Sequence, residues 1–467
     1  MIAMQWTRLP ARAASGQHQP GLPKKLRDSL AARLGSSLGK LFERVGRSPR
    51  PATSEGLLDL AGALLSLRGK ASGPALAAAF LGLYEASELP ARQAFLAQFP
   101  QHHPRDKAAI DHAIAQWNER RDEAAAALLH DAAESPCQRL IRQLNLAPHG
   151  TRRLIAMRAD LLSAPDFSAG LKELDGEFEH VFASWFNAGF LELRRIDWTS
   201  PAIILERLIR YEAVHSINGW DDLRRRVEPA DRRCYGFFHP QMADDPLIFV
   251  EVALTAALPS AIAHVIAEDR PAIDPHLATS AIFYSISNCQ PGLKGIPFGN
   301  FLIKQVVGLL RHELPQLQTF ATLSPVPGLA RWLEREQPGQ TVPAGDALRT
   351  VAAEYLVTAR DKKGQVVDPV ARFHLGNGAR LEAVHADADL STKGLRQSHG
   401  VMVNYLYDLN EIEANHIALV ELDSVMVSAA VKQLLRQHDE PTKSRAATAK
   451  RTTKAASAKS GAPRPER

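Results

Sequence analysis

The sequence predicts an α+β protein of more than one domain, in which an all-helical bundle is followed by a mixed α/β domain. The chain has 467 residues, which exceeds the usual size of a single domain. Hydrophobic residues recur at helical spacing throughout the first part of the chain. Strand-like runs such as Cys234–Phe238 and Ala281–Ser287 occur only after position 190. This change of pattern places the boundary between the two domains at about residue 190.

The composition is that of a soluble globular protein without a nucleic-acid-binding domain. Hydrophobic residues make up 45% and charged residues 23% of the chain, and no apolar run is long enough to span a membrane. Residues 441–467 carry a net charge of +7; subtracting this from the overall +5 leaves −2 for the rest of the chain. The basic character therefore belongs to a tail. The three widely spaced cysteines, Cys137, Cys234 and Cys289, exclude a disulfide framework and a zinc ribbon.

Four segments follow from these patterns. Residues 1–21 are expected to be disordered, and 22–189 to form the helical bundle. Leucines from Leu22 to Leu41 are spaced by three or four residues, as on one face of a helix. Further helices are expected at about 55–68, 75–99, 105–133, 136–146, 151–163 and 168–188. Residues 190–440 should form the α/β domain, and 441–467 a disordered basic tail.

The second half alternates strands and helices. The runs at Cys234–Phe238 and Leu247–Leu254 flank a turn and predict an antiparallel pair. Ala281–Ser287 predicts a buried strand. Further strands are expected at Thr319–Leu323, Ala371–Leu375 and Val401–Tyr407, and helices at Ala261–Glu268, Asn300–His312, Gly328–Glu336 and Glu421–Gln437.

A glycine-rich loop follows the strand at Ala281–Ser287 and opens a helix. It contains Gly292, Gly295 and Gly299 with Lys294 between them. Glycines expose backbone N–H groups and a helix N-terminus adds a positive dipole end, so that such a loop suits a phosphate or pyrophosphate. The spacing matches neither a P-loop nor GxGxxG, and a plain strand–helix connector remains the alternative.

Two side chains could carry chemistry, and each has a structural alternative. Ser324 ends a strand before Pro325, where it could face a ligand or cap a helix. No GxSxG elbow is present, which argues against a serine hydrolase. His374 lies between apolar neighbours and could be catalytic or a structural core residue. His385, Asp387 and Asp389 alternate as metal ligands could, but a solvated turn is the preferred interpretation and no metal site is predicted.

Taken together, these segments resemble the malonyl-CoA decarboxylases. The resemblance rests on RRCYGFFHP from Arg232, PLIFVEVALT from Pro246, the whole stretch Ala281–Leu333, ARFHLGNGA from Ala371 and GVMVNYLY from Gly400. It covers roughly residues 25–437. It implies a helical domain followed by an acetyltransferase-like (GNAT) catalytic domain, which converts malonyl-CoA to acetyl-CoA and CO2 without metal, biotin or other cofactor.

The resemblance also implies the site residues. Ser324 and His374 correspond to the catalytic serine and histidine, and Ser285 and Tyr407 to further active-site positions. The acyl-CoA-binding segment corresponds to Lys294, Gly295, Ile296, Pro297, Phe298, Gly299 and Asn300. Animal members carry a Glu at the position of Pro297, so any role of that carboxylate is absent or moved here.

The implied mechanism passes through an enolate. Loss of CO2 leaves electrons that the thioester carbonyl must accept, and a proton must then reach carbon. Histidine side chains have a pKa near neutrality, so His374 is expected to donate this proton. Ser324 is expected to hold the malonyl carboxylate and to assist the proton transfer, while Tyr407 and Ser285 orient these groups. The glycine-rich loop is expected to bind the CoA pyrophosphate.

The partners follow from the same resemblance, and the location from the three widely spaced cysteines, which fit a reducing compartment. Malonyl-CoA is the expected ligand, the chain is expected to form a homodimer or homotetramer through its helical half, and a cytoplasmic location is expected, with the mitochondrial matrix as the alternative. An acyl-CoA-dependent acyltransferase or a malonyl-CoA-binding sensor on the same fold remains the alternative function. An acyltransferase would need a base for the acceptor amine, and none is evident.

Overall fold

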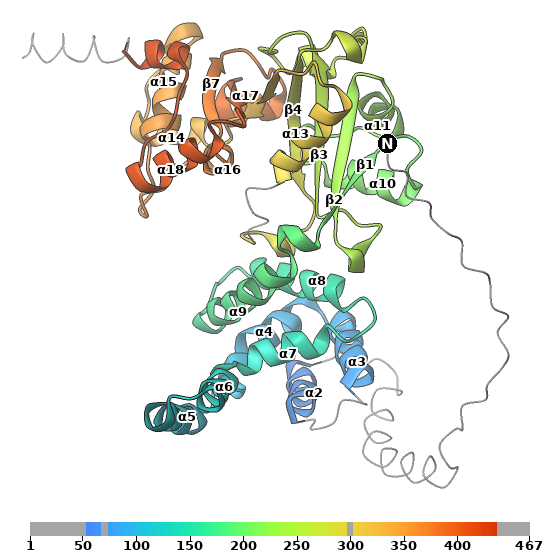
Figure 1. Cartoon of the computed structure of the whole chain (residues 1–467), viewed down its shortest axis with the longest axis vertical. Coiled ribbons are helices and arrows are strands. Elements are labelled where there is room, and N and C mark those ends of the chain that lie inside the picture. The colour runs from blue at the N-terminus through green and yellow to red at the C-terminus, as the bar shows by residue number, and fades with distance from the viewer. Residues whose placement is uncertain (1–52, 67–72, 297–301, 437–467) are drawn as a thin grey trace, which may run out of the picture.

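The computed structural model describes residues 53–66, 73–296 and 302–436. It shows a helical region and a sheet region that meet at a narrow waist (Figure 1). This confirms the predicted α+β class, a helical bundle followed by a mixed sheet. The expected helix at 22–41, the expected disorder of 1–21 and 441–467, and the end of the glycine-rich loop lie outside the described residues.

The helical region runs from α2 to α9. Its helices are α2 (Ser54–Ser66), α3 (Gly73–Ala86), α4 (Leu89–His102), α5 (Lys107–Arg120), α6 (Glu123–Ala133), α7 (Pro136–Leu144), α8 (Gly150–Leu162) and α9 (Ala169–Trp185). Two expected helices are each divided in two. The segment expected at 75–99 breaks before α4, where Glu88 is extended and Pro90 follows in the first turn. The segment expected at 105–133 breaks at Arg121, whose φ is 50°, and Asp122 then caps α6.

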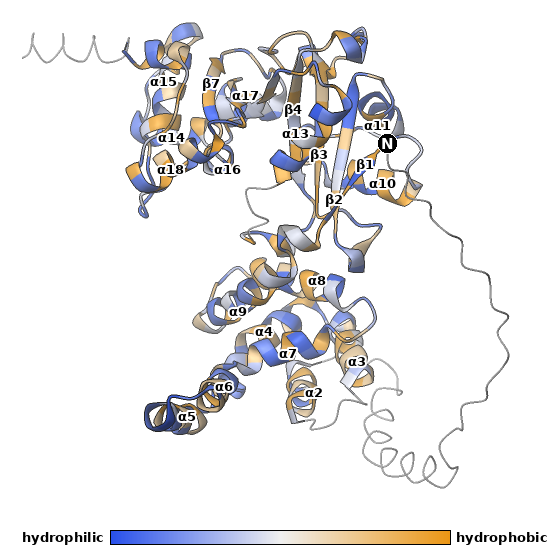
Figure 2. Ribbon diagram, in the orientation of Figure 1, coloured by the Kyte–Doolittle hydropathy of each residue, from blue (hydrophilic) through white to orange (hydrophobic). Residues whose placement is uncertain are grey.

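Apolar packing holds this bundle together. Phe95 of α4 makes tilted ring contacts with Phe80 of α3 and Phe99 of α4, and Phe178 and Phe182 of α9 form a second, edge-on aromatic pair. All five rings are almost fully buried. Figure 2 shows hydrophobic and hydrophilic residues on different faces of these helices, as the sequence periodicity predicts.

The second region is built on one mixed sheet. Its strands are β1 (Glu192–Ile196), β2 (Arg232–Phe238), β3 (Ile248–Thr255), β4 (Ser280–Asn288), β5 (Thr319–Thr322), β6 (Ser324–Pro325), β7 (Arg380–His385) and β8 (Met402–Leu406). Strands β1 to β4 are antiparallel neighbours, whereas β4 and β5 are parallel. Strand β8 pairs antiparallel with β5, β6 and β7. The sheet therefore brings the chain after residue 370 beside β4 and β5.

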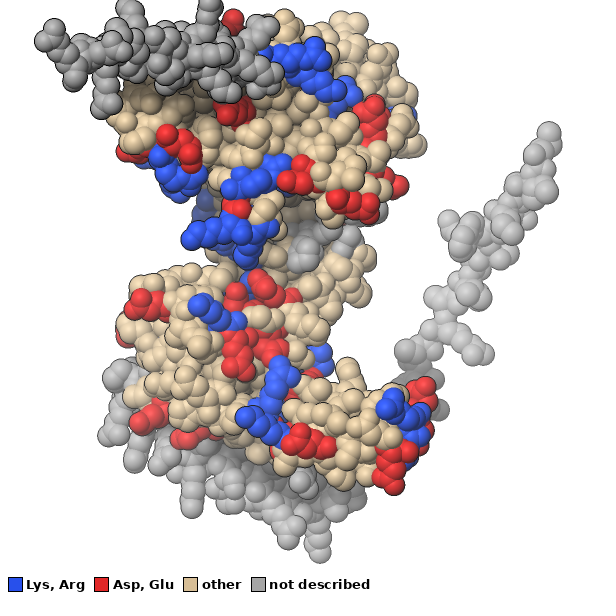
Figure 3. Space-filling view, turned by 90° about the vertical axis from the view of Figure 1, so that its left-hand side faces the viewer, with Lys and Arg blue, Asp and Glu red and all other residues tan. Residues whose placement is uncertain are grey.

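Helices cover both ends of this sheet. α10 (Ala202–Tyr211) and α11 (Trp220–Val227) place Leu205, Leu208 and Leu223 in a cluster with Phe249 of β3. The short helix α12 (Ala263–Ile266) follows β3, and α13 (Leu302–Glu313) follows β4. The remaining helices are α14 (Leu329–Glu336), α15 (Gly345–Thr358), α16 (Pro369–Gly376), α17 (Thr392–Ser398) and α18 (Ile412–Leu422). On the face drawn in Figure 3, acidic and basic side chains are interspersed over both regions.

Most predicted elements of the sheet region are present. The antiparallel pair of β2 and β3, the buried strand β4, strands β5 and β8, and helices α13 and α14 are confirmed. The helix expected at Ala261–Glu268 is shorter than expected, because only the single turn of α12 forms. Strands β1 and β7 and helices α10, α11, α15, α17 and α18 were not predicted.

Two predictions in this region are wrong. Ala371–Leu375, expected as a strand, lies in helix α16, because Asp368 accepts hydrogen bonds from Val370 N and Ala371 N and Pro369 occupies the first helical turn. The helix expected over Glu421–Gln437 is interrupted. α18 ends at Leu422, Asp423 has a φ of 46°, and helix resumes only at 429–436.

Candidate active site

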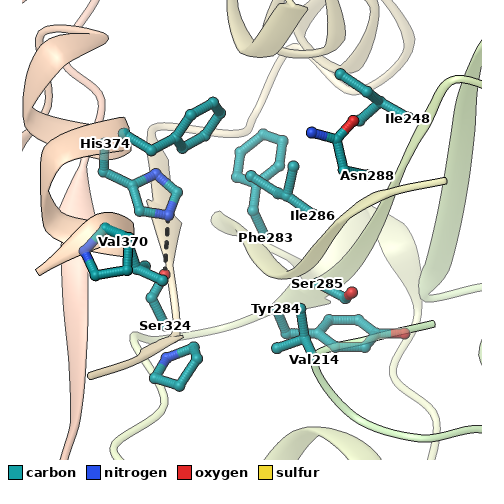
Figure 4. A pocket seen from close by; sticks show the side chains of 13 residues that line it. Val214, Ile248, Phe283, Tyr284, Ser285, Ile286, Asn288, Ser324, Val370 and His374 are labelled. Atoms are coloured by element: carbon teal, nitrogen blue, oxygen red, sulfur yellow. Dashed lines mark hydrogen bonds between the residues drawn. The ribbon is translucent and has the colours of Figure 1, made fainter. Parts of the chain in front are cut away.

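A cavity of about 220 Å³ lies between β4, β6 and α16. Figure 4 shows Ser324 and His374 on one side of it and Ser285 on the other. Polar side chains at the cavity are Ser285, Asn288, Ser324 and His374. The remaining lining is mostly apolar, and it comprises Val214, Ile248, Phe283, Tyr284, Ile286, Pro325, Pro369, Val370 and Phe373. The cavity is therefore an apolar pocket with a few polar groups, the usual composition of a small-molecule site.

The polar groups on one side form a chain of hydrogen bonds. Ser324 Oγ lies 3.1 Å from His374 Nε2, and Tyr407 Oη lies 2.8 Å from His374 Nδ1. Ser324 Oγ also donates to Thr322 Oγ1 at 2.8 Å. With that donation, Ser324 accepts from Nε2–H, and Nδ1 accepts from the Tyr407 hydroxyl. The structure therefore favours the neutral Nε2–H tautomer of His374.

Secondary structure holds these groups in place. Ser324 pairs through β6 with Val403 of β8, and Tyr407 follows β8 directly. His374 lies in the last turn of α16, where its ring stacks on Tyr405 with centroids 4.8 Å apart. Asp368 caps α16 and also accepts from Gly328 N, which begins α14. Because Gly328 occupies the N-cap position of α14, Ser324 does not cap a helix.

Burial determines the charge of His374. The ring is almost wholly buried and no carboxylate of the described residues bonds to it, so burial lowers the pKa of His374 from its ordinary 6.5 to about 3. Burial raises the pKa of Tyr407 as well. The expectation of a near-neutral pKa for His374 is therefore wrong for the unliganded protein, in which the imidazole is uncharged.

Ser285 lies across the cavity and contacts a carboxylate that the sequence analysis overlooked. Ser285 Oγ donates to Glu212 at 2.9 Å from Oε1 and 2.7 Å from Oε2. Glu212 ends α10 and is only 8% exposed. Ser285 does not contact His374, Ser324 or Tyr407 by any hydrogen bond between described residues, so it belongs to a separate polar group of the same cavity.

The glycine-rich loop lies at the waist of the molecule. Lys294 and Gly295 are exposed, Ile296 is buried, and Pro297, Phe298, Gly299 and Asn300 lie outside the described residues. Gly295 has a φ of 82°, which favours glycine. Arg158 of α8 is 1% exposed and donates to Gly292 O at 2.9 Å and Lys294 O at 2.8 Å. The helical region therefore holds the loop directly.

The alternating triplet near β7 has other partners. His385 Nε2 lies 2.6 Å from Asn404 Oδ1, and Asp389 Oδ1 accepts from Ser391 N at 3.0 Å. Asp389 is buried, so the expectation of a fully solvated turn is wrong for this residue. Within residues 53–66, 73–296 and 302–436, no group of three His, Cys, Asp or Glu side chains is arranged to hold a metal ion.

Four residues of the site were not predicted. Val214 and Asn288 line the cavity, whereas Glu212 and Thr322 bond to the lining residues Ser285 and Ser324, and the four come from three separate segments. Asn288 immediately precedes the glycine-rich loop, which was the one available clue. Over the described part of the chain, no helix is long and apolar enough to cross a membrane.

The sequence matches two family profiles. Residues 103–186 match a profile described as the malonyl-CoA decarboxylase N-terminal domain, and residues 189–344 and 343–445 match the C-terminal domain. The chain is 32% identical to the mitochondrial malonyl-CoA decarboxylase of Anser anser anser, over 90% of this chain and 96% of that protein. It is 33% identical to the mouse protein of the same name, over 65% and 72% of the two chains.

Solved structures agree with these matches. The malonyl-CoA decarboxylase of Rhodopseudomonas palustris is 48% identical, with a TM-score of 0.76, and the match covers 82% of this chain and all of that one. The malonyl-CoA decarboxylase of Agrobacterium vitis is 49% identical, with a TM-score of 0.76, and the match covers 81% and 99% of the two chains.

Proposed function

This chain belongs to the malonyl-CoA decarboxylase family, and we propose that the hydrogen-bonded chain Ser324–His374–Tyr407 carries its reaction, the conversion of malonyl-CoA to acetyl-CoA and CO2. The observation that carries this assignment is the pairing of Ser324 with His374 at the edge of an apolar cavity. An enolate mechanism needs a positioned proton donor and a site that holds little water.

The first step breaks the bond between the α-carbon and the carboxylate. The electron pair moves into the thioester carbonyl as an enolate, and CO2 leaves as a neutral apolar molecule. Ile286, Val370 and Phe373 line the cavity and favour CO2 over a carboxylate, which loses hydration there. Ser324 holds the malonyl carboxylate before the bond breaks, once its hydroxyl turns its hydrogen from Thr322 to the carboxylate, which is the stronger acceptor.

The second step forms a C–H bond at the α-carbon. His374 is uncharged before substrate binds, but a bound carboxylate brings a negative charge into the same buried pocket. That charge favours the imidazolium, so that the histidine takes up a proton from solvent together with the substrate. Nε2, which faces Ser324 and the cavity, then delivers the proton to the enolate carbon, and the net reaction consumes one proton.

Tyr407 keeps the imidazole in position for this transfer. Its hydroxyl donates to Nδ1 in the unliganded state and can accept from Nδ1–H once the ring is protonated. One hydroxyl thus serves both states of the ring. The high pKa of Tyr407, raised by burial, keeps the phenol protonated throughout.

The CoA moiety is proposed to bind at the glycine-rich loop. In the described part of this segment Lys294 and Gly295 are exposed, Lys294 supplies a positive charge, and α13 follows from Leu302. Binding energy from this remote part of the substrate holds the malonyl group at Ser324 and His374.

We further propose that turnover requires no metal, biotin or other cofactor, because side chains supply both the proton and the contacts to the carboxylate. Activity should be unchanged in EDTA. Loss on chelation that one added ion restores would contradict this proposal.

The central experiment follows acetyl-CoA and CO2 from purified protein and malonyl-CoA, with no acyl acceptor present. Ser324→Ala and His374→Ala should each slow turnover, and the double variant should lose less than the product of the two single losses if the residues act as a unit. Binding without turnover by the wild-type protein would instead indicate a sensor, and turnover only with an added amine an acyltransferase.

We propose the assembly from the family and the location from the three widely spaced cysteines. A homodimer or homotetramer should be visible by light scattering of the purified chain. A cytoplasmic location is proposed, although the vertebrate relatives are named as mitochondrial. Fractionation of cells that express the chain would decide between cytoplasm and mitochondrial matrix.

A further inference from the structure

Glu212 is a buried carboxylate that the mechanism above does not use. It accepts from Val214 N at 2.7 Å and His215 N at 2.8 Å through Oε1. It also accepts from Ser285 Oγ, and from Ser287 Oγ at 3.1 Å from Oε2. Every one of these contacts is a donation to the carboxylate. Such a concentration of donors on one buried side chain points to a defined role.

Glu212 also helps to fix one wall of the cavity. Val214 lines the cavity from a loop without regular structure. Arg226 donates to His215 O at 2.7 Å and Ser216 O at 3.0 Å, and Lys393 donates to Val214 O at 3.0 Å. The backbone N–H and C=O groups of this loop are therefore held by three charged side chains: Glu212 at the end of α10, Arg226 of α11 and Lys393 of α17. The wall that carries Val214 and Ser285 is built before substrate arrives.

The contacts of Glu212 determine what Ser285 can offer a ligand. A serine hydroxyl has one hydrogen and two lone pairs. Ser285 directs that hydrogen to Glu212, at 2.7 Å from Oε2, so only lone pairs remain for the cavity. On the opposite side, Ser324 directs its hydrogen to the neutral hydroxyl of Thr322, a weaker acceptor than a carboxylate, so that a bound anion can draw this hydrogen to the cavity (Figure 4). The wall that carries Ser285 accepts hydrogen bonds, and the wall that carries Ser324 and His374 can donate them.

We propose that Glu212 sets the orientation of the substrate in the cavity. It makes Ser285 an obligate hydrogen-bond acceptor for the N–H of the CoA arm nearest the thioester. It also turns the malonyl carboxylate away from this wall, toward Ser324 and His374. This inference rests on the proposed function and assigns two specificity-determining groups to the same cavity. The amide of the cysteamine unit is the N–H donor nearest the thioester in any acyl-CoA. A malonyl carboxylate, which has only acceptors, finds no partner at Ser285 and a like charge behind it.

The charge of Glu212 also affects the pKa of a neighbouring carboxyl group. Glu251 on β3, fully buried and paired with Ser285 in the sheet register, has its pKa raised to about 8 by burial and then by the neighbouring Glu212. A bound malonyl carboxylate near Ser285 would meet the same unfavourable field.

The first test removes the N–H from the substrate. Wild-type protein is compared on a malonyl thioester of the pantetheine arm and on its ester isostere, in which oxygen replaces the cysteamine N–H. One lost hydrogen bond should lower kcat/KM by roughly tenfold. In Ser285→Ala the two substrates should be used almost equally. Equal use by the wild-type protein, or full discrimination by Ser285→Ala, would overturn the inference.

The second test reverses the hydrogen-bonding character of the wall that carries Ser285 without changing its shape. In Glu212→Gln the amide NH2 can replace Oε2 beside Ser285, so that the serine hydroxyl turns its hydrogen to the cavity. Discrimination between amide and ester should then fall, because Ser285 spends one lone pair on the glutamine amide and can itself donate to the cavity. The malonyl carboxylate should also bind in the wrong orientation, which lowers kcat and KM together, by roughly tenfold each, and leaves kcat/KM less affected. A fall of kcat with unchanged KM would contradict the proposal.

Ser287→Ala is the matched control. It removes another hydroxyl donor to Glu212 but none at the cavity, so discrimination between the two substrates should remain. If Glu212→Gln does not fold, Ser285→Ala and Ser287→Ala still decide the question. If wild-type protein does not decarboxylate malonyl-CoA at all, the proposed function fails. If it does and these variants behave like wild type, only this inference fails.

Discussion

The helical region and the sheet region bury different kinds of side chain. Among the described residues of α2 to α9, the buried charged side chains are Arg158 and Glu177. The sheet region buries many more ionisable side chains: Glu212, His215, Arg226, Asp231, Arg232, Arg233, Asp245, Glu251, Asp368, His374 and Asp389. Burial of charge is unfavourable unless partners offset it. The sheet region therefore depends on partners such as Glu251 for Arg226, and two of its buried ionisable groups, His374 and Glu212, lie at the cavity or contact a residue that lines it.

The two regions also differ in what their polar contacts hold. In the helical region, caps such as Asp122 to Ala125 N and long-range contacts such as Tyr84 to Asp160 fix the helices and their packing. In the site, Ser324 and His374 are 50 positions apart, and Ser285 and Glu212 are 73 apart. Substitutions should therefore act locally on stability in the helical region and on turnover in the sheet region. Each prediction below tests this distinction, from the largest expected effect to the smallest.

The largest contrast is between His374→Ala and Phe182→Ala. Loss of the proton donor should lower kcat by about 100- to 10,000-fold while CoA binding, measured by calorimetry, is retained. Phe182 is fully buried in the helical region, and its truncation should cost about 3–5 kcal/mol of stability but leave kcat per folded molecule near normal. Near-normal turnover by His374→Ala would show that this residue has another role.

The second contrast concerns acid stability. Between pH 6.5 and about pH 3 the unfolded chain binds a proton that folded His374 does not, because burial lowers its pKa to about 3. Stability should therefore rise with pH through this window and be lost as pH falls, by up to a few kcal/mol. Urea unfolding at several pH values should show a shallower pH dependence for His374→Gln. The exposed His312→Gln is the control and should keep the wild-type slope; the same slope in His374→Gln would refute the prediction.

A third prediction concerns the place where the regions meet. Arg158→Met removes the donor to Gly292 O and Lys294 O and should loosen the glycine-rich loop. We expect KM for malonyl-CoA to rise by roughly tenfold, with kcat within about twofold of wild type. Arg105→Met is the control, since Arg105 pairs with Glu177 in the helical region and does not touch the loop. An equal rise of KM in both variants would mean that the loop contact is not responsible.

The smallest expected effect is at a helix cap. Asp122→Ala removes the cap of α6 and should cost about 1 kcal/mol of stability without changing kcat or KM. Thermal unfolding and steady-state kinetics on the same preparation measure both. A change in kcat would show that the helical region is coupled to the site more closely than its contacts indicate.

Much of the fold was predictable because its signals are local. Leu247–Leu254 and Ala281–Ser287 form strands β3 and β4, as their apolar runs indicate. Ala371–Leu375 was predicted wrongly, because the decisive signal is the Asp368 cap with Pro369 rather than the apolar residues. The split at Arg121 was missed for a similar reason: a left-handed residue between two helices leaves little trace in the hydrophobic pattern.

The sequence by itself determined the helical and mixed character of the two regions, the family, and the residue types of Ser324, His374, Ser285 and Tyr407. Their arrangement was decided by the tertiary structure. The pairing of β8 with β5, β6 and β7 carries Tyr407 to His374, and α10 ends with Glu212 behind Ser285. The pKa of His374 is likewise a tertiary property, since desolvation depends on what surrounds the ring. Periodicity and caps act within a few residues, whereas hydrogen bonds and burial depend on which distant segments fold together.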